Sequence, residues 1–362
     1  MHMSRKVISA GHICLDITPV FPGGHTYSEA GELLAPGKLI QLAGTTTYTG
    51  GSVGNSGLAL KVLGADVTLL GKVGDDAFGS AVKSITGKYG AFGLITDPAV
   101  STSYTIVLAI PGIDRIFVID TGANDTFSGS DIPEEALEDV CLFHYGYPPV
   151  MKKFYSDEGQ ELSGMYRRMK DHGIATSLDM SYIDPDSPAG KANWRAILEK
   201  TLPYTDLFLP SYEDICGIFG EPDPDAVADK ISSALSMAEE MIDMGAAVVM
   251  VKCGTQGICY RTADRSRIEK IGPRLAIDAD AWADQSGIQK SFKAPRVLSA
   301  TAAGDAAIAA FLKAVLDGYG PAGSVRFAAA EGCCAVTTYD TLSGLKTLDE
   351  LEAMIAAGWE TN

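Results

Sequence analysis

Short apolar runs alternate along most of the chain with longer stretches in which apolar residues recur at helical spacing. Lys6–Ala10 (KVISA) and Asp66–Leu70 (DVTLL) have the pattern of strands. Between them, Val53–Leu63 has the spacing of a helix, which we expect to end at Gly64. Strands separated by helices predict an α/β fold with a mainly parallel sheet and helices on both faces.

The same alternation continues through the second half of the chain. Asp157–His172 is predicted to be helical. Arg261–Lys293 is polar and irregular, and we expect an excursion between late strands there. Neither an internal repeat nor a convincing linker divides the sequence, so residues 1–362 are expected to form one domain. The later predicted strands are Ile174–Leu178, Leu207–Leu209 and Ala246–Val251.

Two stretches interrupt this alternation. His25–Tyr48 is rich in Gly and Thr, and Ser101–Phe127 contains two alternating runs (YTIVLAI and DRIFVID) around Pro111-Gly112. The second stretch predicts a β-hairpin. An antiparallel flap beside an α/β core suggests a lid over a cleft, made of segments about 17–49 and 101–127. An extra sheet used only for dimer contacts is the alternative.

Composition narrows the class of protein. The 362 residues are 46% hydrophobic and 21% charged, as in an ordinary globular protein, and the net charge of −17 argues against a nucleic-acid or membrane partner. No apolar run approaches the roughly 20 residues of a membrane span, and no signal-peptide pattern opens the chain. Seven Cys without metal-ligand spacing predict buried thiols in a reducing compartment. We expect a cytoplasmic protein.

Four acidic residues and one glycine directly follow predicted strands. In open α/β sheets the ligand lies beyond the carboxyl ends of the strands, so these residues are expected to share one rim. Any one of them could instead cap a helix. They are Asp16, Asp179, Glu213, Asp214 and Gly254.

Two glycine-rich segments could approach a ligand closely. Gly50–Asn55 (GGSVGN) precedes a helix, and its paired glycines allow backbone conformations that other residues avoid. A Gly-rich helix entry without a ligand is equally common. Lys252–Gly257 (KCGTQG) follows a strong strand, and its amides could wrap a phosphate or a ribose. A plain tight turn into the next strand explains it as well.

Thr301–Asp305 (TAAGD) carries the sharpest chemical signal. Unpaired amides and the helix dipole give the start of the following helix a partial positive charge, and small residues let a phosphoryl group reach it. A carboxylate there would repel a phosphate unless it serves as a general base for an attacking hydroxyl. Asp305 is therefore a candidate base, or else an acid that only stabilises the first helical turn.

In this order, the motifs resemble those of the ribokinase/PfkB family of carbohydrate kinases over nearly the whole chain. Gly50–Gly79 is similar to the family's N-terminal signature, and TAAGDA is similar to its C-terminal GAGD signature. GANDTF (Gly122–Phe127) is similar to the ribokinase GAN segment, and VKCGTQG to the nucleotide-binding strand and turn. LPSYEDI (Leu209–Ile215) lies where the family has N-x-x-E.

The resemblance implies a ribokinase-like three-layer α/β/α core with a small β-sheet lid. It also implies ATP-dependent transfer of the γ-phosphate to a hydroxymethyl group of a sugar or sugar derivative, with Mg²⁺ on the ATP phosphates. Asp305 would be the general base, and the amides of Ala302, Ala303 and Gly304 the anion hole. The other implied residues are Asp16, Gly51 and Asn55 for the substrate, Lys252, Gly254, Gly257 and Thr301 for the nucleotide, and Ser211 and Asp214 for water-mediated Mg²⁺.

Three positions depart from the family pattern. Ser299 replaces an acid that helps a monovalent-cation site in ribokinase-like members, and Ser211-x-x-Asp214 replaces N-x-x-E. Ala302 replaces the first glycine of the anion hole, so a positive φ at this residue would be costly.

Three functions stay open on the sequence. The first is a sugar kinase, in which Arg115 of the lid could meet an acid or phosphate on the substrate. The second is a nucleoside kinase of the same family, with a base slot formed by Tyr48, Tyr104 and Phe117. The third is a catalytically weak sugar-binding or regulatory protein on this fold. The sequence does not identify the sugar, and it is compatible with a homodimer formed through the lid.

Overall fold

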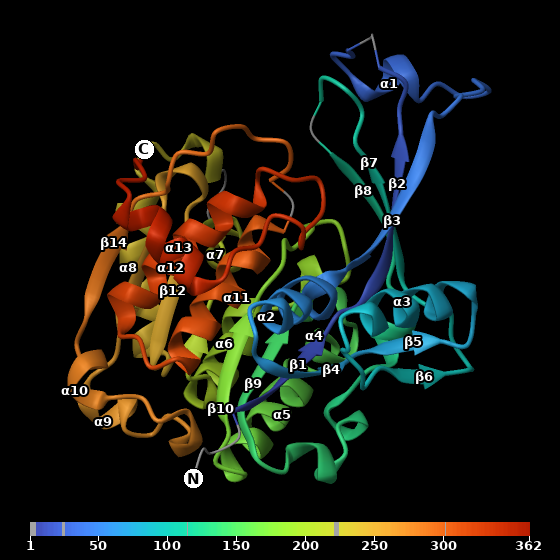
Figure 1. The fold of residues 1–362 in the computed structure, drawn as a ribbon. Helices are drawn as coiled ribbons and strands as arrows, with labels where there is room; N and C mark the ends of the chain where they lie inside the picture. Colours follow the sequence, from blue (N-terminus) through green and yellow to red (C-terminus); the bar gives the residue numbers. More distant parts are fainter. Residues whose placement is uncertain (1–4, 24–25, 114, 221–223, 301) are drawn as a thin grey trace.

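A computed structural model describes residues 5–23, 26–113, 115–220, 224–300 and 302–362. Its centre is an eight-stranded sheet in the order β14-β13-β12-β11-β10-β9-β1-β4 (Figure 1). The six strands from β12 to β4 are parallel, while β13 and β14 at one edge are antiparallel. The strands are β1 Lys6–Gly11, β4 Asp66–Leu70, β9 Val140–Gly146, β10 Ala175–Asp179, β11 Leu207–Phe208, β12 Val248–Lys252, β13 Ile258–Thr262 and β14 Ser286–Gln289.

Helices cover both faces of this sheet, because neighbouring strand residues point to opposite sides and both sides are apolar. Val248 belongs to the core on one face and Val249 to the core on the other. The first core includes α2 Leu58–Val62, α11 Ala303–Leu316, α12 Pro321–Ala335 and α13 Leu348–Ala356. The second includes α4 Lys153–Ser156, α5 Gln160–Asp171, α6 Trp194–Thr201, α7 Tyr212–Phe219 and α8 Lys230–Asp243. The predicted three-layer α/β/α architecture is confirmed.

A separate four-stranded sheet in the order β3-β2-β7-β8 projects from the core (Figure 1). Its strands are β2 Cys14–Val20, β3 Gly44–Gly50, β7 Tyr104–Leu108 and β8 Ile116–Asp120. The short helix α1 (Ala30–Leu33) lies at its far end. β7 and β8 pair antiparallel, so the predicted hairpin is present. We call these four strands the lid sheet; the assignment of the whole chain to one domain remains a prediction.

Other elements connect these layers. A third, two-stranded sheet pairs β5 (Lys72–Gly74) with β6 (Ile95–Asp97), and α3 (Ala77–Lys88) lies between them in the chain. The helices α9 (Arg265–Ile268) and α10 (Ala279–Trp282) follow β13.

Some element boundaries differ from the sequence prediction. Residues 261–293 are more than an excursion, because they supply the edge strand β14, which pairs with β13. The helix predicted to start at Asp157 begins at Gln160, since Gly159 before it adopts a left-handed conformation with φ 77°. All seven cysteines are buried and free. Within the described ranges, no helix has the length and apolar character needed to span a membrane.

Candidate active site

The site lies at the carboxyl ends of β1 and β9, where the order of strands reverses direction. From β1 the chain reaches β4 on one side, whereas β9 and the later parallel strands lie on the other side. Such a switch point leaves a crevice beyond the strand ends. Gly11 and Gly146 close the two strands so tightly that a Cβ on Gly11 would lie 2.4 Å from the Gly146 carbonyl oxygen. His12 and Tyr147 follow these glycines into the crevice.

Asp305 enters this crevice from the first turn of α11 and is 4% exposed. Its carboxylate accepts three side-chain hydrogen bonds. Ser56 Oγ donates to Oδ1 at 2.6 Å. Asn55 Nδ2 and Tyr147 OH donate to Oδ2 at 3.2 Å and 2.7 Å. Burial raises the pKa of Asp305, while the three donors and the nearby Lys252 charge act to lower it.

Ala302 precedes α11 with φ 61° and ψ 6°, in the left-handed region. The conformation that the sequence analysis identified as costly is therefore present, at a strain of about 1–2 kcal/mol. The amide of Ala303 donates to the Ala300 carbonyl in a long hydrogen bond of 3.4 Å. Thr301, a predicted nucleotide contact, lies outside the described residues.

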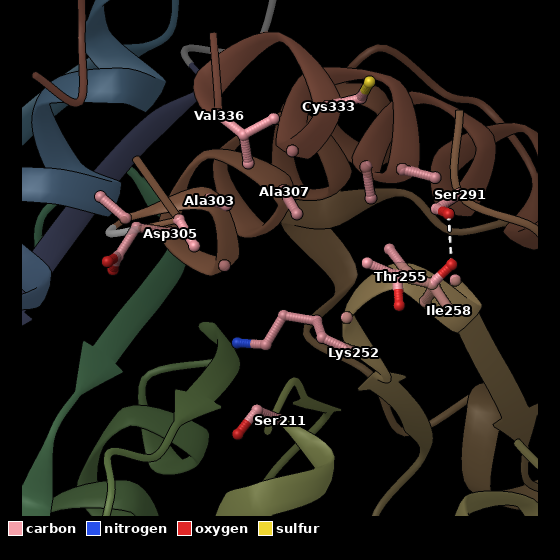
Figure 2. A pocket seen from close by; sticks show the side chains of 18 of the residues that line it. Ser211, Lys252, Thr255, Ile258, Ser291, Ala303, Asp305, Ala307, Cys333 and Val336 are labelled. Atoms are coloured by element: carbon pink, nitrogen blue, oxygen red, sulfur yellow. Dashed lines mark hydrogen bonds between the residues drawn. The ribbon is translucent and has the colours of Figure 1, made fainter. Parts of the chain in front are cut away.

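Lys252 supplies positive charge to a cluster of buried carboxylates. Its ammonium pairs with Asp179 Oδ1 at 3.0 Å, and a Cβ added to Gly304 would lie 3.6 Å from Nζ. Figure 2 shows Lys252 reaching from β12 toward the turn that carries Asp305. The pKa of Asp179 is raised to about 7, mainly by burial and also by the Asp214 and Asp305 charges, while the Lys252 charge acts to lower it. The cluster leaves Lys252 between anionic groups and the start of α11.

These residues line a pocket of about 920 Å³ (Figure 2). Gly254 and Gly257 form a tight turn between β12 and β13, with φ of 56° and 109°. Much of the remaining lining is apolar: in Figure 2, Ile258 lies beside Thr255 of this turn, and Ala307 and Val336 lie on the side of Ala303. Of the predicted site residues, the lining includes Ala302, Ala303, Gly304, Asp305, Lys252, Gly254, Gly257, Ser211 and Asp214.

Ser211 and Asp214 form a capping box at the start of α7. Ser211 Oγ accepts from the Asp214 amide at 3.1 Å, and Asp214 Oδ2 accepts from the Ser211 amide at 2.9 Å. This leaves Asp214 Oδ1 for the pocket. Among the described residues no cluster of three or more His, Cys, Asp or Glu could hold a metal. Carboxylate and hydroxyl oxygens suit Mg²⁺, but these two residues fit an ion held mostly by phosphates and water.

The predicted substrate residues lie on the lid side of Asp305. Asp16 on β2 accepts from Cys14 Sγ at 3.2 Å, and burial raises its pKa to about 6. Gly51 (φ 79°) packs on His12, where a Cβ would lie 2.4 Å from Nδ1. Asn55 accepts from Thr341 Oγ1 at 3.1 Å through the Oδ1 of its side chain. Arg115 lies in the β7–β8 hairpin and is not among the residues that line the pocket.

The sequence analysis missed two donors to Asp305. Ser56 follows Asn55 in the π-helix Val53–Gly57, which replaces the first turn of the predicted helix. That turn places both side chains on Asp305. Tyr147 follows a buried strand within Gly-Tyr-Pro-Pro, and an aromatic residue directly after a strand end was the available signal.

Comparison with known proteins assigns this chain to a family. The sequence model of the pfkB family of carbohydrate kinases matches residues 13–348. The chain belongs to the pfkB family. It is therefore a carbohydrate kinase, a phosphotransferase that acts on an alcohol group.

Known pfkB proteins resemble this chain at low identity over most of its length. A curated ribokinase from Bacillus subtilis is 22% identical, covering 86% of this chain and 88% of its own. An uncharacterized sugar kinase from Archaeoglobus fulgidus is 25% identical, covering 63% of this chain and 82% of its own. The ribokinase of Thermotoga maritima superposes with a TM-score of 0.69 at 18% identity, over 97% of this chain and 99% of that one. The Arabidopsis thaliana ribokinase complexed with ribose and ATP superposes with a TM-score of 0.68 at 18% identity, over 98% of this chain and 99% of that one.

Proposed function

We propose that this pfkB kinase transfers the γ-phosphate of ATP to a hydroxymethyl group of a sugar or sugar derivative. One observation carries the proposal. The buried Asp305 carboxylate lies in the first turn of α11, at the end of the pocket that also contains Lys252 and the Gly254–Gly257 turn. A buried carboxylate, a helix N-terminus and a lysine therefore line one pocket, and this arrangement supports the proposal.

Asp305 would act as general base. Its carboxylate accepts the proton of the acceptor hydroxyl as the oxygen attacks the γ-phosphorus, while the bond to the β-phosphate oxygen breaks and ADP leaves. The surrounding donors favour the ionised carboxylate, which is the form that can accept a proton.

The turn before α11 would bind the charge that develops on the phosphoryl group. The amides of Ala302, Ala303 and Gly304 form the proposed anion hole, and the dipole of α11 adds to them. The Lys252 ammonium lies beside Gly304 and would compensate for the surrounding carboxylates. In a chain of net charge −17, this local positive charge is needed for nucleotide binding.

ATP would occupy the pocket with its phosphates at Lys252 and its base in the apolar part. Gly254 and Gly257 would let the turn approach the nucleotide closely. Ser211 and Asp214 would hold Mg²⁺ through water. When bound, the ion neutralises the phosphate oxygens.

The acceptor would bind on the lid side, with Asp16, Gly51 and Asn55 at its hydroxyls and Arg115 as a further lid contact. A nucleoside acceptor is less well supported. In the lid sheet, Asp16 is paired with Tyr48 on one side and with Thr105 on the other, so these three side chains share a face. Tyr104 precedes Thr105 in the same strand and therefore points to the opposite face. The Tyr104 ring instead contacts Phe78, with centroids 5.4 Å apart.

ATP consumption across a panel of sugars and nucleosides tests the function. We expect turnover with a sugar, and Asp305→Asn should lower kcat by about 10²-fold or more, as expected for loss of a general base. Asp317→Asn, at the other end of α11, is the matched control. Sugar binding without ATP consumption would favour the regulatory alternative. An Asp305→Asn variant with full turnover would rule out the base assignment.

A further inference from the structure

Tyr147 combines a strained backbone with a direct contact to the proposed base. Its φ and ψ are 68° and 43°, in the left-handed region that costs a non-glycine residue free energy. Pro148 follows it, and a residue before proline normally adopts an extended conformation. This conformation places the phenol in the crevice, where it donates to Asp305 Oδ2 at 2.7 Å.

The donors on Asp305 are divided unequally between its two oxygens. An ionised carboxylate offers about four lone-pair positions, two on each oxygen. Tyr147 and Asn55 fill those of Oδ2, while Ser56 fills one on Oδ1. The remaining position on Oδ1 is the one that an acceptor hydroxyl can use.

We propose that Tyr147 is a positioning residue, whose phenol holds Asp305 Oδ2 so that Oδ1 is the oxygen that takes the proton of the acceptor. This inference rests on the proposed kinase reaction. The transferred proton ends on Oδ1, the acceptor oxygen bonds to the γ-phosphorus, and ADP leaves with the electrons of the broken bond. Tyr147 keeps its own proton throughout.

The phenol is suited to this role because it stays neutral. Burial raises the pKa of Tyr147 well above its ordinary value, and the charges of Asp305 and Asp179 raise it further. Tyr147 therefore remains a donor over the working pH range. The His12 ring lies 6.3 Å from that of Tyr147, and burial lowers the pKa of His12 to about 4, so His12 is neutral there.

Several charged groups act on Asp305 besides its three donors. Lys252 on β12 lowers the pKa of Asp305, and Asp305 in turn raises the pKa values of Asp16 on β2 and Asp179 on β10. Asp214 on α7 lines the same pocket. None of these groups changes when Tyr147 becomes Phe, so the substitution isolates the phenol.

Two measurements on Tyr147→Phe test the proposal, with Tyr145→Phe as the matched control. Tyr145 lies two residues earlier, and its hydroxyl contacts Met151 Sδ at 3.0 Å rather than the site. The first measurement is the pKa of the Asp305 carboxyl, from the carbon-13 spectrum of aspartate-labelled unliganded protein, with the resonance identified by its loss in Asp305→Asn. The second is the pH profile of kcat/KM.

We expect Tyr147→Phe to raise the pKa of Asp305 by about one pH unit. The acid limb of kcat/KM should move upward by the same amount. KM for ATP should change less than about twofold, because the phenol that is removed donates to Asp305 and the ring that lines the pocket is kept. Tyr145→Phe should leave both measurements unchanged. A role in folding alone would lower the thermal midpoint without moving the acid limb.

The outcomes separate this inference from the kinase assignment. An unmoved Asp305 pKa in Tyr147→Phe overturns the inference even if the protein is an active kinase. Suppose instead that the Asp305 pKa shifts in Tyr147→Phe but the wild-type protein consumes no ATP with any acceptor. The contact would then be established and the proposed reaction ruled out. Equal shifts in both Phe variants would also overturn the inference, because the effect would then be general.

Discussion

Ala302 shows how a single residue can keep a backbone conformation at a cost in conformational energy. The turn before α11 needs a left-handed residue, and this chain supplies alanine, whose Cβ makes that conformation unfavourable. The backbone nevertheless takes the required path, since α11 is buried along most of its length and fixes the turn from its other side. The departure from the family glycine therefore changes stability more than geometry.

We expect Ala302→Gly to leave the free energy of unfolding unchanged or to raise it by up to about 1 kcal/mol. Relief of left-handed strain is partly offset by the greater freedom of glycine in the unfolded chain. Ala303→Gly, at the next residue and within the helix, should lower stability by roughly 0.5 kcal/mol. Denaturant unfolding measures both, and equal destabilisation by the two variants would contradict the strain argument.

At this scale the sequence predicted Asp305 but not its partners. Asp305 stands at a helix start after small residues, and both features are local. Ser56 and Tyr147 have no local feature that points to a carboxylate 249 and 158 residues away. Their roles depend on which strand ends and helix starts meet in the crevice.

At the scale of one element, α12 contains an acid in an apolar environment. Glu331 is fully buried; its Oε1 accepts from the Lys346 amide at 2.8 Å, while its Oε2 has no hydrogen-bond partner in the described part of the chain. Burial raises the pKa of Glu331 to about 8. This buried acid makes the stability of the folded chain depend on pH.

We expect Glu331→Gln to flatten the loss of stability between about pH 4.5 and pH 8. Between the unfolded pKa of about 4.5 and the folded value of about 8, only the folded state keeps the proton, so the free energy of unfolding falls as pH rises. The slope for one group is at most about 1.4 kcal/mol per pH unit. The variant should exceed wild type at pH 8.5 by about 1 kcal/mol or more, and the difference should shrink at pH 5.

Denaturant midpoints from pH 5 to 9 measure this difference, with the exposed Glu138→Gln as control. Asp16 and Asp179 also have raised pKa values, so they too make the free energy of unfolding fall as pH rises. Only the difference between variant and wild type therefore reports on Glu331. Parallel curves for wild type and Glu331→Gln would show that the carboxyl does not titrate in this range.

At the scale of the whole molecule, the lid sheet leaves apolar side chains uncovered. Phe117, Val118 and Ile119 on its edge strand β8 are 55%, 50% and 44% exposed. Adjacent exposed apolar residues on an edge strand indicate an interaction surface. We therefore expect two copies to pair through their lid sheets.

Phe117→Lys should weaken this dimer about 100-fold or more, because pairing would bury an unpartnered charge. Phe92→Lys is the control, since Phe92 is 70% exposed and lies outside the lid sheet. Sedimentation equilibrium at several concentrations measures the dissociation constants. A monomeric wild type at micromolar concentration, or equal dissociation of both variants, would contradict lid pairing.

The sequence by itself determined the order and type of most elements, the α/β class and the position of Asp305. These depend on apolar periodicity and on helix-start chemistry, which act between near neighbours in the chain. Only the tertiary structure decided what surrounds Asp305. Asn55, Ser56, Tyr147 and Lys252 reach it because β1, β9 and β12 end at one edge and α11 begins there. The burial that raises the pKa of Asp305, and the contacts that oppose it, arise from that meeting of distant segments.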